Sequence, residues 1–143
     1  MSAFWRNWLN LWCWAVAAFG LLLIGAGFPA TSGPTEALIA QLHSGGALEF
    51  DAPLHFSFGL MGALTLGLAL LVATGARAAD ALGPRGRPIW SMLTTSLLAW
   101  YVIDSIISIA NGFALNAVSN TLLMITFLAP ILASGVLRQP ATA

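Results

Sequence analysis

The sequence predicts an all-α integral membrane protein in which four transmembrane helices form an up-down bundle with both termini in the cytoplasm. Composition carries the first part of this prediction. Of the 143 residues, 59% are hydrophobic and 7% are charged, and the mean hydropathy is +0.88. A soluble domain carries roughly 25% charged residues. We therefore interpret residues 1–143 as a single transmembrane domain surrounded by the lipid bilayer.

Four stretches are long and apolar enough to cross a bilayer, whose core takes roughly 20 residues of helix. Breaks rich in Gly and Pro separate them. The predicted spans run from about 5 to 28, 54 to 76, 89 to 110 and 116 to 137. The first stretch is longer than the apolar part of a cleaved signal peptide and begins with several tryptophans. We expect it to remain as a helix.

The placement of arginine predicts the orientation. Every arginine falls at the end of a span or in a connection on one side of the predicted topology: Arg6, Arg77, Arg85, Arg87 and Arg138. Cytoplasmic segments carry the excess of basic residues, so we expect both termini in the cytoplasm, in the inner (plasma) membrane of a bacterium. Four tryptophans lie near the same ends of the spans, where an indole prefers the membrane interface: Trp5, Trp8, Trp12 and Trp90.

The first outer connection, residues 29–53, is long enough for structure of its own. Pro34 suits the first turn of a helix and Gly45-Gly46 would end it. Leu38, Ile39 and Leu42 would then share one face. This pattern predicts a short amphipathic helix on the outer surface, with an ordinary ordered loop as the alternative.

Small residues predict where helices pack closely. Gly59, Ala63 and Gly67 recur every four residues and would form a smooth stripe on the second span. In the fourth span, Pro130 lacks the N–H that would bond the carbonyl of Thr126. We expect that carbonyl to lack its usual donor.

The third span has a polar face. Thr94, Tyr101, Asp104, Ser108 and Asn111 fall on one side of a helix. The tight turn at 111–113 makes the third and fourth spans antiparallel neighbours. Together these features predict one polar cluster in the outer half of the membrane, made of Asp104, Ser108, Asn111, Asn116 and Asn120.

Asp104 needs a reason to be there, because an aspartate at the centre of a span costs about 2.5–3.5 kcal/mol. Either it carries a proton, or it accepts hydrogen bonds from several donors. Two interpretations remain open. One is a site for a proton or a ligand, with candidate residues Asp104, Tyr101, Ser108, Asn111, Asn116, Asn120 and His55. The other is a polar network that fixes the pairing of two helices.

His55 lies at the outer end of the second span, four residues after Asp51. Asp51 is expected to cap this helix and to contact His55. The alternative is a link from His55 to Asp104, which would form a proton pathway that opens outward. His43, in the loop, is expected to be solvated.

The sequence favours a protein without enzymatic activity. It contains none of the catalytic or phosphate-binding motifs considered, and Cys13 is the single cysteine, which excludes an internal disulfide. We expect no metal, no cofactor and no nucleic-acid partner.

The favoured function is therefore a small subunit or homo-oligomer that binds another membrane component, its partner being a second copy or another membrane protein. One alternative is a small transporter or proton-coupled carrier that uses Asp104. Another is a lipid-modifying enzyme embedded in the membrane.

Overall fold

The computed structural model describes residues 1–138, which are mostly helical and contain no strand. Helix α1 (Ala3–Gly25), helix α3 (Ala52–Ala81) and helix α5 (Ala114–Ala133) are each long and apolar enough to cross a membrane. So is α4 (Arg87–Ala110) together with the 3-10 helix η2 (Gly83–Gly86) before it. A 3-10 turn η1 (Pro29–Thr31) and a fifth helix, α2 (Gly33–Leu42), lie in the connection from α1 to α3. The short helix predicted there is confirmed.

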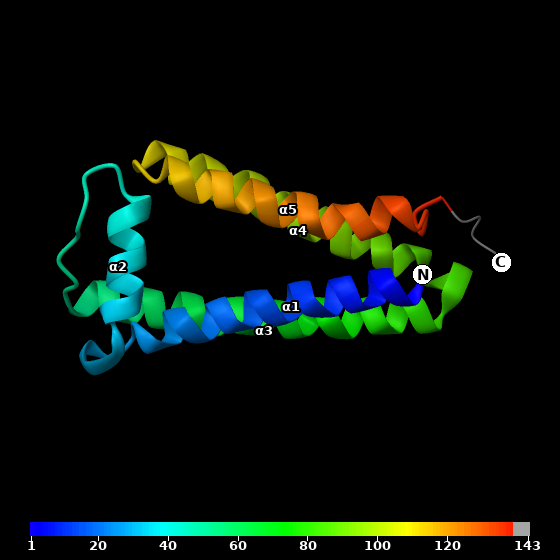
Figure 1. The fold of residues 1–143 in the computed structure, drawn as a ribbon, viewed down its shortest axis with the longest axis horizontal. Coiled ribbons are helices and arrows are strands. Elements are labelled where there is room, and N and C mark those ends of the chain that lie inside the picture. The colour runs from blue at the N-terminus through cyan, green and yellow to red at the C-terminus, as the bar shows by residue number, and fades with distance from the viewer. Residues whose placement is uncertain (139–143) are drawn as a thin grey trace.

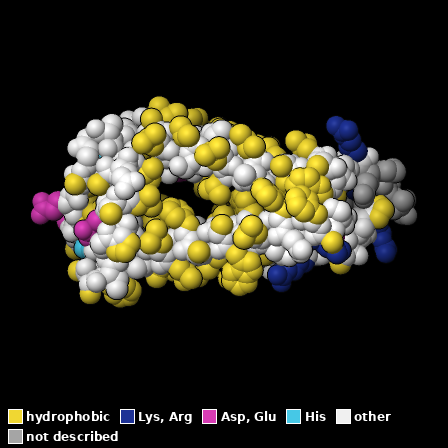
Figure 2. All heavy atoms as spheres, in the orientation of Figure 1, with side chains coloured by type: hydrophobic (Ala, Val, Ile, Leu, Met, Phe, Trp, Pro, Cys, Tyr) yellow, Lys and Arg dark blue, Asp and Glu magenta, His cyan; other side chains and the backbone are white. Residues whose placement is uncertain are grey.

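The long helices form two pairs. Figure 1 shows α1 beside α3, α4 beside α5, and α2 running across one end from the first pair toward the second. The N-terminus and the end of α5 lie at the opposite end. In Figure 2 the arginines gather at that opposite end, while aspartate and glutamate side chains lie near α2. We call these the arginine end and the α2 end.

Glycine brings α1 and α3 into backbone contact. A Cβ atom on Gly62 would lie 2.4 Å from the backbone nitrogen of Ile24, and one on Gly20 would lie 2.7 Å from that of Leu66. Nearer the α2 end, a Cβ on Gly59 would lie 3.0 Å from the Cα of Gly27. Without side chains at these positions the two backbones approach as closely as helices can.

The predicted stripe of Gly59, Ala63 and Gly67 is therefore wrong in two of its three positions. Ala63 is exposed, and a Cβ on Gly67 would meet no atom within 4 Å. A helix turns once in 3.6 residues, so positions spaced strictly by four rotate away from a straight contact line. The face that meets α1 alternates steps of three and four, which places Gly62 in the contact.

The core lies in the half of the molecule toward the arginine end. Phe127 and Ile131 of α5, Leu97 and Trp90 of α4, and Val72 of α3 are each at most 2% exposed. Trp90, near the start of α4, thus fills the core and does not expose its indole. The turn before α4 lies directly against the end of α3, since a Cβ on Gly86 would lie only 2.0 Å from the carbonyl oxygen of Ala79.

Indole donors join the two pairs. Pro130 lies inside α5, and the Trp8 Nε1–H of α1 donates to the Thr126 carbonyl oxygen at 2.8 Å. One turn along, the Trp12 Nε1–H donates to the carbonyl of Leu123 at 3.0 Å. The carbonyl that the sequence predicts to lack its usual donor is therefore satisfied by another helix.

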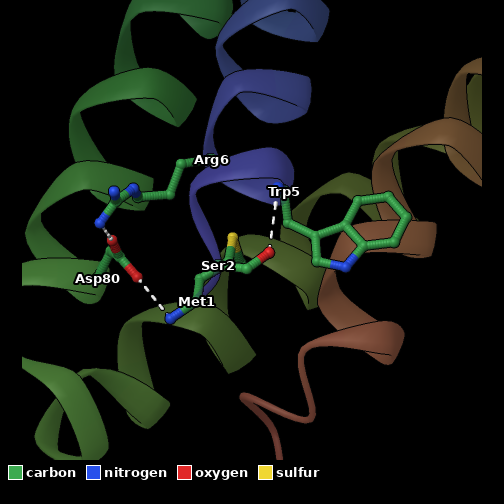
Figure 3. A network of polar contacts seen from close by, with 5 residues as sticks. All are labelled: Met1, Ser2, Trp5, Arg6 and Asp80. Atoms are coloured by element: carbon green, nitrogen blue, oxygen red, sulfur yellow. Dashed lines mark hydrogen bonds and ion pairs between the residues drawn. The ribbon is translucent and has the colours of Figure 1, made fainter.

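Polar contacts also fasten the start of α1 to the end of α3 (Figure 3). The Asp80 carboxylate lies 3.0 Å from the Met1 ammonium nitrogen and 3.5 Å from Arg6 Nη1. Beside it, the Ser2 hydroxyl caps α1 by accepting from the backbone N–H of Trp5 at 3.4 Å. These contacts fix the register of the two helices at the arginine end.

We predict that Trp8→Phe lowers the free energy of unfolding by about 0.5–1.5 kcal/mol, because it keeps the ring but removes the donor to Thr126. In a Pro130→Ala background the restored backbone N–H serves that carbonyl, so Trp8→Phe should cost less. Unfolding in detergent of the four proteins of this double-mutant cycle measures both effects. Trp14→Phe is the matched control, since Trp14 is 66% exposed. If Trp8→Phe lowered the free energy of unfolding equally in the two backgrounds, the Trp8 indole would not be replacing the donor that Pro130 lacks.

Candidate functional site

A cavity of about 570 Å³ lies between the two pairs of helices, toward the α2 end. Trp12, Leu97 and Leu123 line it on the side of the core, and the apolar face of α2 contributes Leu38 and Ile39 at the other extreme. Figure 2 shows the hollow opening at the side of the molecule, between the pairs. Its volume is within the range of pockets that hold small molecules.

The walls are mostly apolar, and the polar groups come chiefly from one pair. α1 and α3 contribute apolar side chains and the single hydroxyl of Thr65. α4, α5 and the turn between them contribute the remaining polar side chains: Asp104, Ser108, Asn111, Asn116, Ser119 and Asn120. Asp104 is the only ionisable side chain among the lining residues. The charge of the cavity is therefore the charge of this carboxyl group.

Two asparagines of α5 hold the Asp104 side chain. Asn120 Nδ2–H donates to Asp104 Oδ2, and Asn116 Nδ2 lies 3.5 Å from the same oxygen. Asn116 also donates to the Ser108 hydroxyl at 2.9 Å. Asn120 and Ser108 are 5% and 6% exposed, while Asp104 is half-buried. The network thus links α4 to α5 through buried side chains and leaves the Asp104 carboxylate at the cavity wall.

The other oxygen of this carboxylate, Oδ1, accepts no hydrogen bond from any residue in the range 1–138. Both amide donors meet Oδ2, and both are electrically neutral. Asp104 also has no ion pair within that range. The site therefore offers a free acceptor atom to whatever enters the cavity.

Two further candidate residues are placed differently. The Tyr101 hydroxyl lies 3.0 Å from the Thr121 hydroxyl, a separate link between α4 and α5 outside the cavity lining. Asn111 ends α4 at the rim of the cavity, and its Nδ2–H donates to the Ile107 carbonyl of its own helix at 2.8 Å. Of the seven candidates, the structure joins Asp104, Ser108, Asn116 and Asn120 by hydrogen bonds.

His55 is placed away from this network. Its Nδ1–H donates to the carbonyl oxygen of Ala26, 2.7 Å away, just after α1 ends. Asp51 caps α3 as predicted, accepting from the backbone N–H of Leu54 at 2.9 Å. Asp51 and His55 meet through the backbone, where the His55 N–H donates to the Asp51 carbonyl at 3.0 Å, and within the described residues their side chains form no pair. The Ala26 carbonyl accepts this hydrogen bond because the glycine contacts bring the end of α1 directly against α3. His55 does not line the cavity.

The connection after α2 is tied to the turn between α4 and α5. The backbone N–H of Ser44 donates to the Gly112 carbonyl at 3.0 Å, and the His43 ring lies 4.8 Å from that of Phe113. Gly112 has φ +82°, a backbone conformation that glycine adopts without strain. His43, which the sequence predicts to be solvated, is instead partly buried here. Both pairs of helices are thereby linked at the α2 end.

Sequence reasoning misses the apolar half of the site. Ala15 and Phe19 of α1, Phe58 of α3 and Trp100 of α4 line the cavity. Their sequence pattern is that of any apolar span, so no local signal distinguishes a cavity wall from a lipid-facing surface. Among residues 1–138, no three His, Cys, Asp or Glu side chains are grouped so that they could hold a metal ion.

In comparisons with known proteins, no family model, no curated protein and no solved structure matches this chain.

We predict that Asp104→Asn folds as stably as the parent or more so, since an amide keeps hydrogen-bonding capacity without a charge to desolvate. Asp104→Leu should lower the free energy of unfolding by about 1–3 kcal/mol, because the buried Asn120 amide loses its acceptor. Thermal and chemical unfolding in detergent test both variants. A Leu variant as stable as the parent would show that this network does not stabilise the pairing of α4 and α5.

Proposed function

We propose that this chain is a non-enzymatic membrane protein that holds a lipophilic molecule in the cavity between its helix pairs. The observation that carries the proposal is the cavity itself: apolar walls, one ionisable side chain, and a free acceptor atom on that side chain. Pockets of this composition bind apolar molecules and orient them through a few polar groups. Asp104 is the polar anchor in this proposal.

The proposed setting is a bacterial inner membrane, spanned by α1, α3, α4 and α5 as an up-down bundle with both termini in the cytoplasm. The support is the gathering of arginines at one end, seen in Figure 2, and the absence of lysine and arginine from sequence positions 29–53. In this orientation Asp104 lies in the outer half of the bilayer and α2 lies along the outer interface.

The lateral opening supports a ligand drawn from the membrane. α2 covers the cavity toward the outer water, and the core closes it toward the cytoplasmic side. The remaining route runs between the two pairs of helices, where Figure 2 shows the hollow. A molecule dissolved in the bilayer meets this opening directly.

A second candidate function is a small transporter or proton-coupled carrier that uses Asp104. The division into two pairs favours it, since close backbone contact unites α1 with α3 and side-chain hydrogen bonds unite α4 with α5. Relative motion of two such bodies about the indole contacts of Trp8 and Trp12 would also move the bond from Ser44 to Gly112 that joins them at the α2 end.

We predict that a reporter domain fused within the chain at Gly45 is found outside the cytoplasm and that one at Gly83 is found inside it. Both positions are glycines in connections between long helices, so insertion should spare the helices themselves. Paired reporters that are active on opposite sides of the membrane give the readout. A cytoplasmic Gly45 with an external Gly83 would reverse the proposed orientation.

We predict that the chain purified in mild detergent retains a lipophilic molecule and that Ala15→Trp reduces the amount several-fold, because the indole fills the cavity. Ala18→Trp is the matched control, since Ala18 is exposed on the same helix but does not line the cavity. Solvent extraction and mass spectrometry measure the retained molecule per mole of protein. Equal retention by Ala15→Trp and the parent would place the molecule elsewhere, and a stoichiometric protein in place of a small molecule would make the cavity a subunit interface.

A further inference from the structure

The charge of the cavity defines the class of molecule it takes. Building on the proposed function, we propose that the ligand is a lipophilic cation, an amphiphile whose ammonium group pairs with Asp104 while its hydrocarbon part fills the apolar region beside Trp12 and Leu123.

Asp104 has no positively charged partner within residues 1–138. All five arginines of the sequence belong to segments at the arginine end, and Asp104 alone among the cavity-lining residues is ionisable. The titratable groups on neighbouring elements are engaged elsewhere: His43 with Gly46 and Phe113, His55 with Ala26, and Tyr101 with Thr121. An ionised Asp104 therefore has no compensating charge within residues 1–138. A carboxylate without a compensating charge attracts a cation strongly where the dielectric constant is low.

One oxygen of the Asp104 carboxylate is free to accept a hydrogen bond from a ligand. Asn116 and Asn120 use their amide N–H groups on Oδ2 and fix the carboxylate at the wall, while Oδ1 keeps its full accepting capacity. An ammonium N–H can donate to Oδ1 without displacing either asparagine. Such charge-assisted hydrogen bonds are about twice as strong as neutral ones. The anchor is thus held in place before the ligand arrives.

Aromatic side chains contribute to the wall of the cavity that holds Asp104. Trp100, Phe19, Phe58 and Phe113 all line the same cavity. Aromatic faces attract ammonium groups and also pack against alkyl chains. A cation with a hydrocarbon tail uses both properties, whereas a fatty-acid anion or a phospholipid phosphate would be repelled by Asp104.

The experiment compares dodecylammonium, dodecanol and dodecanoate, which share one alkyl chain and differ in head group. Binding is measured by titration calorimetry to the full chain in nanodiscs of zwitterionic lipid, and partition into empty nanodiscs is subtracted. We expect the parent to bind dodecylammonium at least about tenfold more tightly than dodecanol, and dodecanoate not at all.

Three variants separate the possible outcomes. Asp104→Asn should remove the preference for the cation, Asp104→Glu should keep it, and Glu49→Gln, which removes one acidic charge from the exposed connection after α2, should leave it unchanged. Equal affinity of the parent for dodecylammonium and dodecanol, with both lost in Ala15→Trp, would overturn the cation assignment and leave the cavity as a binding site. Absence of saturable binding by every probe, with Ala15→Trp indistinguishable from the parent, would overturn the proposed function itself.

Discussion

The two pairs of helices meet where α5 cannot satisfy its own backbone. Pro130 deprives the Thr126 carbonyl of its helical donor, and an indole of α1 supplies one. In the proposed bilayer setting no water is present to take that role, so the bond both satisfies α5 and ties it to the other pair. Because Trp8 and Trp12 act toward the arginine end, the core forms there, and toward α2 the two pairs stand apart and are bridged by α2 and the connection that follows it. The cavity is the space between these two points of contact.

The polar residues of α4 and α5 are at once a structural network and the polar wall of the cavity. Asn120 and Ser108 are buried and bind α4 to α5, which is the behaviour of residues that fix helix pairing. The same bonds hold Asp104 at the cavity wall with one oxygen unpaired. A binding group whose side chain is already held by neighbouring hydrogen bonds loses little freedom when it engages a ligand. The two interpretations of the sequence are therefore compatible, since the network is the support of the anchor.

Local rules explain which features the sequence predicts. The polar face of α4 and its partners Asn116 and Asn120 follow from helix geometry and a tight turn, both of which act over a few residues. The contact face of α3, the burial of Trp90 and the bond from His55 to Ala26 depend on which helix lies alongside, and no short pattern encodes that. The cavity is harder still to predict, because it arises from the relative placement of two pairs. An apolar residue such as Ala15 gives the same sequence pattern whether it faces lipid or lines a cavity.

The position of α2 across the end of the bundle has a consequence for how tightly any occupant is held. In the proposed bilayer setting, with that end covered, molecules would exchange between the cavity and the bilayer rather than between the cavity and water. Occupancy then follows the concentration of the molecule in the lipid phase, which for a strongly partitioning amphiphile far exceeds its aqueous concentration. A modest intrinsic affinity is enough to keep the site filled in a membrane, whereas retention through purification in mild detergent requires a tighter complex.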